Sequence, residues 1–164
     1  LDKTLVILGR AVVISAPAGL VIWSLANIYI GDNTILYMCT NFLDPFGKLL
    51  GLDGVILFAF ILGIPANEIV VPIIIMSYTA SGNLTDISDL AALKALLTDN
   101  GWTITTAINM LIFTLFHFPC STTCITIYKE TKSLKWTIVS ILLPTIIGIT
   151  ICIFNNLIAN LALY

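Results

Sequence analysis

The chain has 164 residues, of which 59% are hydrophobic and 10% are charged, and its mean hydropathy is +1.05. A soluble domain carries about a quarter charged residues, so this composition excludes an ordinary water-soluble fold and indicates a membrane protein. The formal net charge of −2 argues against a nucleic-acid partner, which would require a basic surface.

Four apolar stretches are long enough to enter the membrane as helices, since about 20 residues are needed to cross ~30 Å of hydrocarbon. They are residues 4–30, with Arg10 as the only charge, and residues 54–79, 102–127 and 136–164. The sequence therefore predicts an all-α, polytopic membrane domain that extends over residues 1–164.

Three polar connections separate these stretches. Residues 31–53 mix bulky apolar and scattered charged side chains, which predicts a short helix lying in the membrane interface. Residues 80–101 predict a surface loop with one amphipathic helix, with Ser88 as its N-cap and Asn100-Gly101 at its end. Residues 128–135 form a short basic connection.

The second and third apolar stretches are not ordinary spans. Pro65 and Pro72 interrupt the second stretch, and Pro119 interrupts the third. Proline lacks a backbone N–H and clashes with the preceding turn, so we expect both helices to break. The freed backbone groups must be buried in protein or line a watery cavity, as they do at transporter binding sites near the membrane midplane.

The distribution of basic residues favours a re-entrant hairpin for residues 54–79. If that stretch crosses fully, the seven Lys and Arg divide four to three between the two sides. If it enters and leaves on one side, they divide five to two, in accord with the positive-inside rule. We therefore predict three full spans, one of them broken at a proline, plus a re-entrant hairpin and an interfacial helix. Loop 128–135 would be cytoplasmic and loop 80–101 periplasmic.

Glu68 is the most informative candidate for a functional residue. A carboxylate within the membrane is costly, so it is expected to face a cavity and to have a partner. Asn67 beside it adds a neutral oxygen ligand. The structural alternative is that Glu68 pairs with a helix N-terminus or with Arg10.

His117, Cys120 and Cys124 form a second candidate group in the broken third stretch. Their spacing would place them on one helical face if the helix continued through Pro119. Imidazole and thiolate ligands suit borderline divalent metals such as Fe²⁺. In the structural alternative, the cysteines are small hydrophobic residues and the histidine bonds a neighbouring helix. Cys39 and Cys152 are expected to be inert packing residues.

The sequence contains none of the enzymatic motifs that would support a catalytic function. Gly47-Lys48 is followed by Leu49 and lacks the rest of a P-loop, and the nucleophile-elbow and zinc-protease motifs do not occur either. We expect that this chain is not an enzyme and has no cofactor of its own.

Several linked motifs together resemble the C-terminal membrane region of the ferrous iron transport protein B (FeoB) family, centred on its second Gate domain. They occur in the order Asp44-Pro45-Phe46-Gly47, Gly63-Ile64-Pro65-Ala66-Asn67-Glu68, Asn100-Gly101-Trp102-Thr103, and His117-Phe118-Pro119-Cys120. The resemblance covers nearly the whole chain.

This resemblance implies uptake of Fe²⁺ across the bacterial inner membrane. In that family an N-terminal G domain hydrolyses GTP with Mg²⁺, two Gate repeats of opposite topology form the pore, and a Gate-motif cysteine handles iron. Cys120 matches that position. The G domain and the first Gate repeat are absent from this sequence, so we expect half a pore that belongs to a longer protein. Its partners would be Fe²⁺, the lipid bilayer, the first Gate repeat, the G domain, a small cytoplasmic Feo accessory protein and further copies of itself.

Two other functions fit the same sequence. A Gate-type transporter for a nucleoside or other organic solute would place aromatic and amide groups at the helix breaks. A membrane scaffold without transport activity would bind a cytoplasmic G protein through residues 128–135.

Overall fold

A computed structural model describes residues 20–21, 23–31, 33–64, 67–79 and 90–162 of the chain. Most of the first expected span, including Arg10, lies outside these residues; residues 20–21 and 23–27 of it are helical. A two-residue ribbon follows, in which β1 (Tyr29–Ile30) pairs antiparallel with β2 (Asn33–Thr34). The described part is otherwise helical, as the sequence predicts, with this small exception to an all-α fold.

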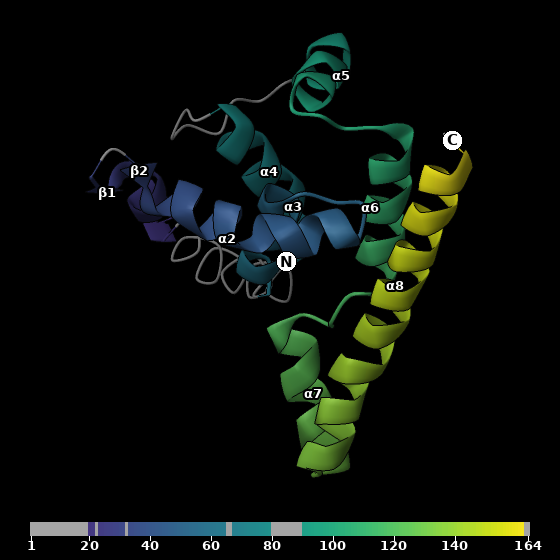
Figure 1. The fold of residues 1–164 in the computed structure, drawn as a ribbon. Helices are drawn as coiled ribbons and strands as arrows, with labels where there is room; N and C mark the ends of the chain where they lie inside the picture. The colour runs from purple at the N-terminus through teal and green to yellow at the C-terminus, as the bar shows by residue number, and fades with distance from the viewer. Residues whose placement is uncertain (1–19, 22, 32, 65–66, 80–89, 163–164) are drawn as a thin grey trace.

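The helix expected near the membrane interface is α2 (Ile35–Leu49). It begins at Thr34, whose side chain accepts a hydrogen bond of 3.2 Å from the N–H of Tyr37 and so caps the first turn. In Figure 1, α2 lies across the molecule, while the later helices α6 and α8 stand upright. This crossed arrangement suits a helix in the plane of the membrane.

The chain bends by 109° between α2 and α3 (Gly54–Leu62). Gly51 takes a positive φ of 67° in the connecting turn, a conformation that favours glycine. Gly54 packs directly on α2: a Cβ placed there would lie 1.9 Å from the carbonyl oxygen of Thr40. The two glycines therefore let α3 leave α2 at a sharp angle and in close contact.

The second apolar stretch forms two short helices. After α3 comes the 3-10 turn η1 (Asn67–Ile69), which leads into α4 (Val70–Thr79). With 9 and 10 residues, α3 and α4 are each about 15 Å long, half the thickness of the hydrocarbon core. The expected break is present before residue 70. The break expected at Pro72 is wrong, because this proline lies in the first turn of α4, where its missing N–H has no helical partner to lose.

The two ends of the α3–α4 pair lie together. The hydroxyl of Tyr78, near the end of α4, donates a short hydrogen bond to the carboxylate of Asp53, the N-cap of α3. The indole N–H of Trp102, just before α6, donates to the same Tyr78 oxygen at 2.8 Å. Both ends of the pair and the start of the next upright helix therefore meet on one side of the molecule.

The amphipathic helix expected within residues 80–101 is α5 (Leu90–Asp99). Its expected N-cap, Ser88, lies outside the described residues. The leucines at 90, 93 and 97 line an apolar hollow with Trp102 and Ile104, and Leu90 and Ile104 remain largely exposed there. The apolar face is therefore only partly covered.

The third apolar stretch forms α6 (Ile104–Phe116) and α7 (Ser121–Thr131), with the break where Pro119 predicts it. The fourth forms α8 (Leu134–Ala162), which runs antiparallel beside both of them (Figure 1). The connection expected over residues 128–135 is shorter than predicted, since only Lys132 and Ser133 lie between α7 and α8. Lys132 makes this tight turn in the left-handed conformation.

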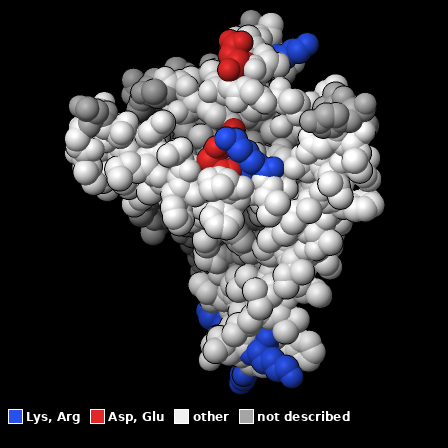
Figure 2. Space-filling view, in the orientation of Figure 1, with Lys and Arg blue, Asp and Glu red and all other residues white. Residues whose placement is uncertain are grey.

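Two helical stretches in the described part are long and apolar enough to cross a membrane, residues Ile104–Thr131 and Leu134–Leu161. The bent α2–α3 pair would add a third. On the face that Figure 2 shows, basic residues gather at the lower end, where α7 meets α8, and the other visible charges lie in the upper part, with an uncharged band between them. The lysines near that turn are Lys129, Lys132 and Lys135.

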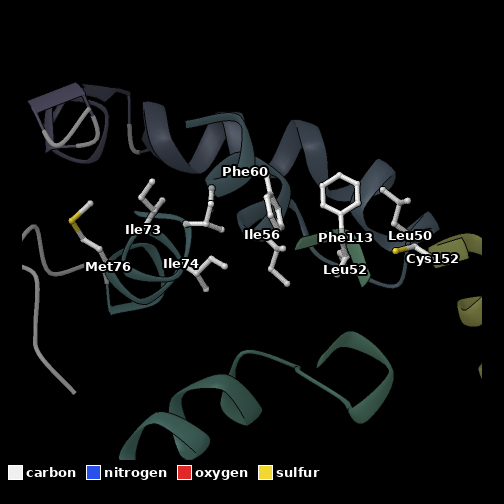
Figure 3. Packing of buried hydrophobic residues seen from close by; sticks show 11 residues of the cluster. Leu50, Leu52, Ile56, Phe60, Ile73, Ile74, Met76, Phe113 and Cys152 are labelled. Atoms are coloured by element: carbon white, nitrogen blue, oxygen red, sulfur yellow. The ribbon is translucent and has the colours of Figure 1, made fainter. Parts of the chain in front are cut away.

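The buried core lies where α3 and α4 meet α6 (Figure 3). Ile56, Phe60 and Ile74 are at most 2% exposed. The ring of Phe60 meets that of Phe113 edge to face, with centroids 4.8 Å apart. This packing fixes the α3–α4 pair against the helix whose lower end carries the break.

Candidate functional site

The break between α6 and α7 extends from His117 to Cys120. His117 ends α6 in an extended conformation, with φ −70° and ψ 173°, and Cys120 precedes α7 in a similar one. The helix therefore does not continue through Pro119. The condition under which His117, Cys120 and Cys124 would share one helical face is therefore not met, because that alignment requires an unbroken helix.

The hairpin formed by α3 and α4 has its tip against this break. The N–H of Ser121, the first residue of α7, donates a hydrogen bond of 2.9 Å to the carbonyl oxygen of Ile64 in the tip. The first N–H groups of a helix have no partner within the helix, and the tip supplies one. The two interrupted elements thus satisfy each other's backbone groups, as required in a membrane domain.

His117 is held in one orientation by its neighbours. Its Nδ1 lies 2.8 Å from the carbonyl oxygen of Thr114, and its ring lies 5.0 Å from the ring of Phe60 and 5.3 Å from that of Phe118. A carbonyl oxygen can only accept, so Nδ1 carries the proton and Nε2 of the neutral ring carries a lone pair.

The Nε2 atom of His117 is buried and has no hydrogen-bond partner among the described residues. The same is true of Oδ1 of Asn67 in the tip. A buried polar atom without a partner is costly in protein, and more so in a membrane. Histidines that bind metals commonly donate their other ring N–H to a carbonyl in this way.

These groups surround one open cavity of about 400 Å³. Asn67 lines it from the hairpin tip, and His117, Pro119 and Cys120 line it from the break. The side of α8 completes the lining with two residues that sequence reasoning missed, Ser140 and Pro144. The signal that could have found them is a proline in the middle of an apolar run, the same signal that marked Pro65 and Pro119.

The two cysteines of the broken span differ in their surroundings. The sulfur of Cys120 lines the cavity and lies 3.1 Å from the hydroxyl oxygen of Thr123. Cys124 lies one turn further along α7, and its thiol donates to the carbonyl oxygen of Pro119 at 3.4 Å. Cys120 is thus better placed than Cys124 to meet a ligand in the cavity.

Glu68 belongs to η1 in its backbone, but its side chain lies outside the described residues. Among the side chains that are described, no three of His, Cys, Asp and Glu come together as a metal site. The described part of the cavity offers one imidazole, one thiol and one amide, together with the hydroxyls of Thr114, Thr123 and Ser140. Whether Glu68 joins them stays a prediction from the sequence.

The two cysteines expected to be inert lie elsewhere. Cys152, on α8, is fully buried in the core and its thiol donates to the carbonyl oxygen of Asn109 at 3.5 Å. Cys39 is half-buried on α2.

Comparison with known proteins gives one match. No curated protein and no solved structure matches the chain. A protein-family model described as Gate, nucleoside recognition, matches residues 8–134, which is most of the chain and includes the hairpin and the broken span. Together with the apolar helices, this match identifies a membrane protein of the transporter type. The chain belongs to the Gate family.

Proposed function

We propose that this chain is a permease segment for ferrous iron, half of the pore of a GTP-linked transporter in the bacterial inner membrane. The observation that carries the proposal is the Nε2 atom of His117, which is buried and has no hydrogen-bond partner among the described residues, at a cavity that Cys120 also lines. Imidazole and thiolate groups together suit Fe²⁺ better than Mg²⁺ or Ca²⁺, which prefer oxygen ligands.

Charge compensation is the second requirement for a dication inside a membrane. Glu68 follows Asn67 directly in η1, and Asn67 lines the cavity. We propose that the Glu68 carboxylate supplies the negative charge and that Cys120 supplies the soft ligand. Binding stays weak, since a permeating ion must leave as readily as it enters.

The wider assembly follows from the resemblance of the sequence to the FeoB family. A first Gate repeat would cover the open side of the cavity, and a G domain would couple GTP hydrolysis to transport. A small Feo accessory protein and further copies of the chain are additional proposed partners. Lys129, Lys132 and Lys135 would lie on the cytoplasmic side, where basic residues are favoured.

The test is uptake of ⁵⁵Fe²⁺ by cells that express the natural polypeptide containing this chain. Cys120→Ser and Glu68→Gln are each expected to reduce the initial rate by roughly tenfold, the effect of about 1.4 kcal/mol of lost interaction. Cys39→Ser, on α2, is the matched control and should transport at the parental rate. Parental transport by both Cys120→Ser and Glu68→Gln, at equal amounts of protein in the membrane, would refute the proposed site.

A nucleoside or similar organic solute is the second candidate, because the matching family is described as nucleoside recognition. The cavity volume of about 400 Å³ falls within the range of small-molecule sites, and Asn67 and Phe118 could offer an amide and an aromatic face. Uptake of radiolabelled uridine in the same cells distinguishes the two. Uridine uptake that is lost in Asn67→Ala, without any ⁵⁵Fe²⁺ uptake, would favour the solute over the metal.

A further inference from the structure

The helix α8 lies beyond the matched residues 8–134, apart from its first residue, yet it forms one wall of the cavity. It is a single helix of 29 residues with one proline, Pro144, near its middle. A helical residue normally donates its N–H to the carbonyl oxygen four residues earlier. Pro144 has no N–H, so it cannot donate to the carbonyl of Ser140.

The helical turn from Ser140 to Pro144 lies at the cavity. Residues four apart in a helix lie on the same face, and both Ser140 and Pro144 line the cavity. The carbonyl of Ser140 points along the helix toward residue 144, on that same face. The hydroxyl of Ser140 donates to the carbonyl oxygen of Thr137 at 2.7 Å, which leaves lone pairs on its oxygen.

The sulfur and nitrogen ligands of the cavity come from the helix break. Cys120 and His117 come from the break, and the described residues place one amide oxygen, that of Asn67, in the tip. Thr114 and Thr123, of α6 and α7, also line the cavity, but their hydroxyls already bond Met110 and Cys120. A dication that gives up part of its water shell there needs further oxygen ligands, and α8 is the wall that can add them. Backbone carbonyls and hydroxyls serve this purpose in ion pathways without adding charge.

We propose that the Ser140–Pro144 turn of α8 supplies the carbonyl and hydroxyl oxygens of Ser140 as ligands to the transported cation, in the cavity that His117 and Cys120 also line. The inference rests on the proposed function and adds a third helix to the site. These oxygens are hard ligands, so they set how well the pathway accepts Mn²⁺, which is harder than Fe²⁺. Ion selectivity would thus depend on both ligand types, with the Cys120 thiolate as the soft ligand and the Ser140 oxygens as the hard ligands.

The experiment compares Pro144→Ala and Ser140→Ala with the parent in ⁵⁵Fe²⁺ uptake, with and without competing Mn²⁺. Pro144→Ala restores an N–H that pairs with the Ser140 carbonyl, and Ser140→Ala removes the hydroxyl. Each variant should lower uptake by roughly fivefold, the worth of one modest oxygen contact, and Mn²⁺ should compete less well than in the parent. A helix that is merely straightened would slow both ions alike and leave the competition unchanged.

Thr150→Val is the matched control, because Thr150 is an exposed hydroxyl residue of α8 that bonds its own helix at the carbonyl oxygen of Ile146. It should match the parent in both measurements. Parental Mn²⁺ competition in Pro144→Ala and Ser140→Ala, while Cys120→Ser has lost uptake, would overturn this inference and leave the proposed function standing. Parental uptake in Pro144→Ala, Ser140→Ala, Cys120→Ser and Glu68→Gln would overturn both. If Pro144→Ala does not accumulate in the membrane, the Mn²⁺ competition of Ser140→Ala decides alone.

Discussion

Two asparagines of this small domain differ in how their buried side-chain amides are hydrogen-bonded. Asn109, in α6, is fully buried, and its side chain donates to the carbonyl oxygen of Leu50 at 2.8 Å and accepts from Asn155 at 2.7 Å. Asn67, in the hairpin tip, has a buried Oδ1 without a partner among the described residues. The Asn109 amide thus has a structural role, whereas the Asn67 amide oxygen lies at a cavity without a partner among the described residues.

The same contrast extends to the regions around them. Where the α2–α3 turn meets α6 and α8, the asparagine amides pair with one another and with main-chain carbonyls; Asn156 also donates to the carbonyl oxygens of Lys48 and Leu49. Among the described residues, the buried hydroxyl of Ser77, near the end of α4, is the exception in the upper part and has no partner. The lower region, around the helix break, leaves both Asn67 Oδ1 and His117 Nε2 unpaired among the described residues. A membrane domain tolerates such atoms where a ligand or water completes them, so function is expected where two of them lie at one cavity.

The sharpest test of which way the two regions face is accessibility, since labelling is all or none. In a background without native cysteines, Lys48→Cys and Lys94→Cys should both react with an impermeant thiol reagent from outside the cell. Lys132→Cys should react only after the membrane is opened. The Lys48 side chain is 73% exposed, so it can react without unfolding.

This result is expected because Asp53 and Tyr78 join the two ends of the hairpin on one side. Labelling of Lys48→Cys and Lys94→Cys from opposite sides would mean that residues 54–79 cross the membrane.

The largest loss of stability is expected for Asn109→Ala in the upper region. It leaves the Leu50 carbonyl and the Asn155 amide without their partner, at a cost of about 3 kcal/mol or more. For a domain of this size, that lowers the thermal midpoint of the detergent-solubilised protein by roughly 6–12 °C. Asn100→Ala, which removes an exposed bond within α5's end, is the control and should change little.

A smaller loss is expected for Tyr78→Phe, which removes the bond between the hairpin ends and the acceptor of the Trp102 N–H. The bond to the Asp53 carboxylate makes about 2 kcal/mol a reasonable expectation. Thermal unfolding measures it, with Tyr37→Phe as the control because Tyr37 is exposed on α2. Equal midpoints for the two variants would show that the bond does not hold the ends together.

The smallest effect on stability is expected for Asn67→Leu in the lower region. It removes an unpaired buried oxygen, so the free energy of unfolding should change by no more than about 0.5 kcal/mol. Uptake of ⁵⁵Fe²⁺ should nevertheless fall. A large drop in the thermal midpoint would show instead that Asn67 is as structural as Asn109, and the contrast between the two amides would be lost.

Much of the helical pattern could be predicted from local sequence. Pro65 and Pro119 marked the breaks correctly, and the apolar run from residue 136 marked α8 to within two residues at its start. These predictions succeed because a proline acts on its own turn and because span length depends only on adjacent residues. Pro72 was misjudged since the same proline is harmless in a first turn, and the start of α4 was not known.

The site could be predicted only in part, because its geometry depends on residues distant in the sequence. Asn67 and Cys120 line one cavity although 53 positions separate them along the chain, and no local pattern reveals that Ser140 faces both. Cys124 was grouped with Cys120 by helical spacing, but the extended conformation at Cys120 breaks that spacing. The hydrogen bond from Asn109 to Leu50 likewise could not be predicted from the sequence, since an amide inside an apolar helix has many possible acceptors.

The hydrogen bond from Ser121 to Ile64 has a mechanical consequence. It joins main chain to main chain, so almost any exchange of either side chain leaves it in place, and only proline at position 121 deletes the donor. While the bond persists, α7 cannot swing relative to α6 without carrying the hairpin tip along. Opening and closing of the pathway therefore involve both interrupted elements as one moving part, or else begin with the rupture of this single bond.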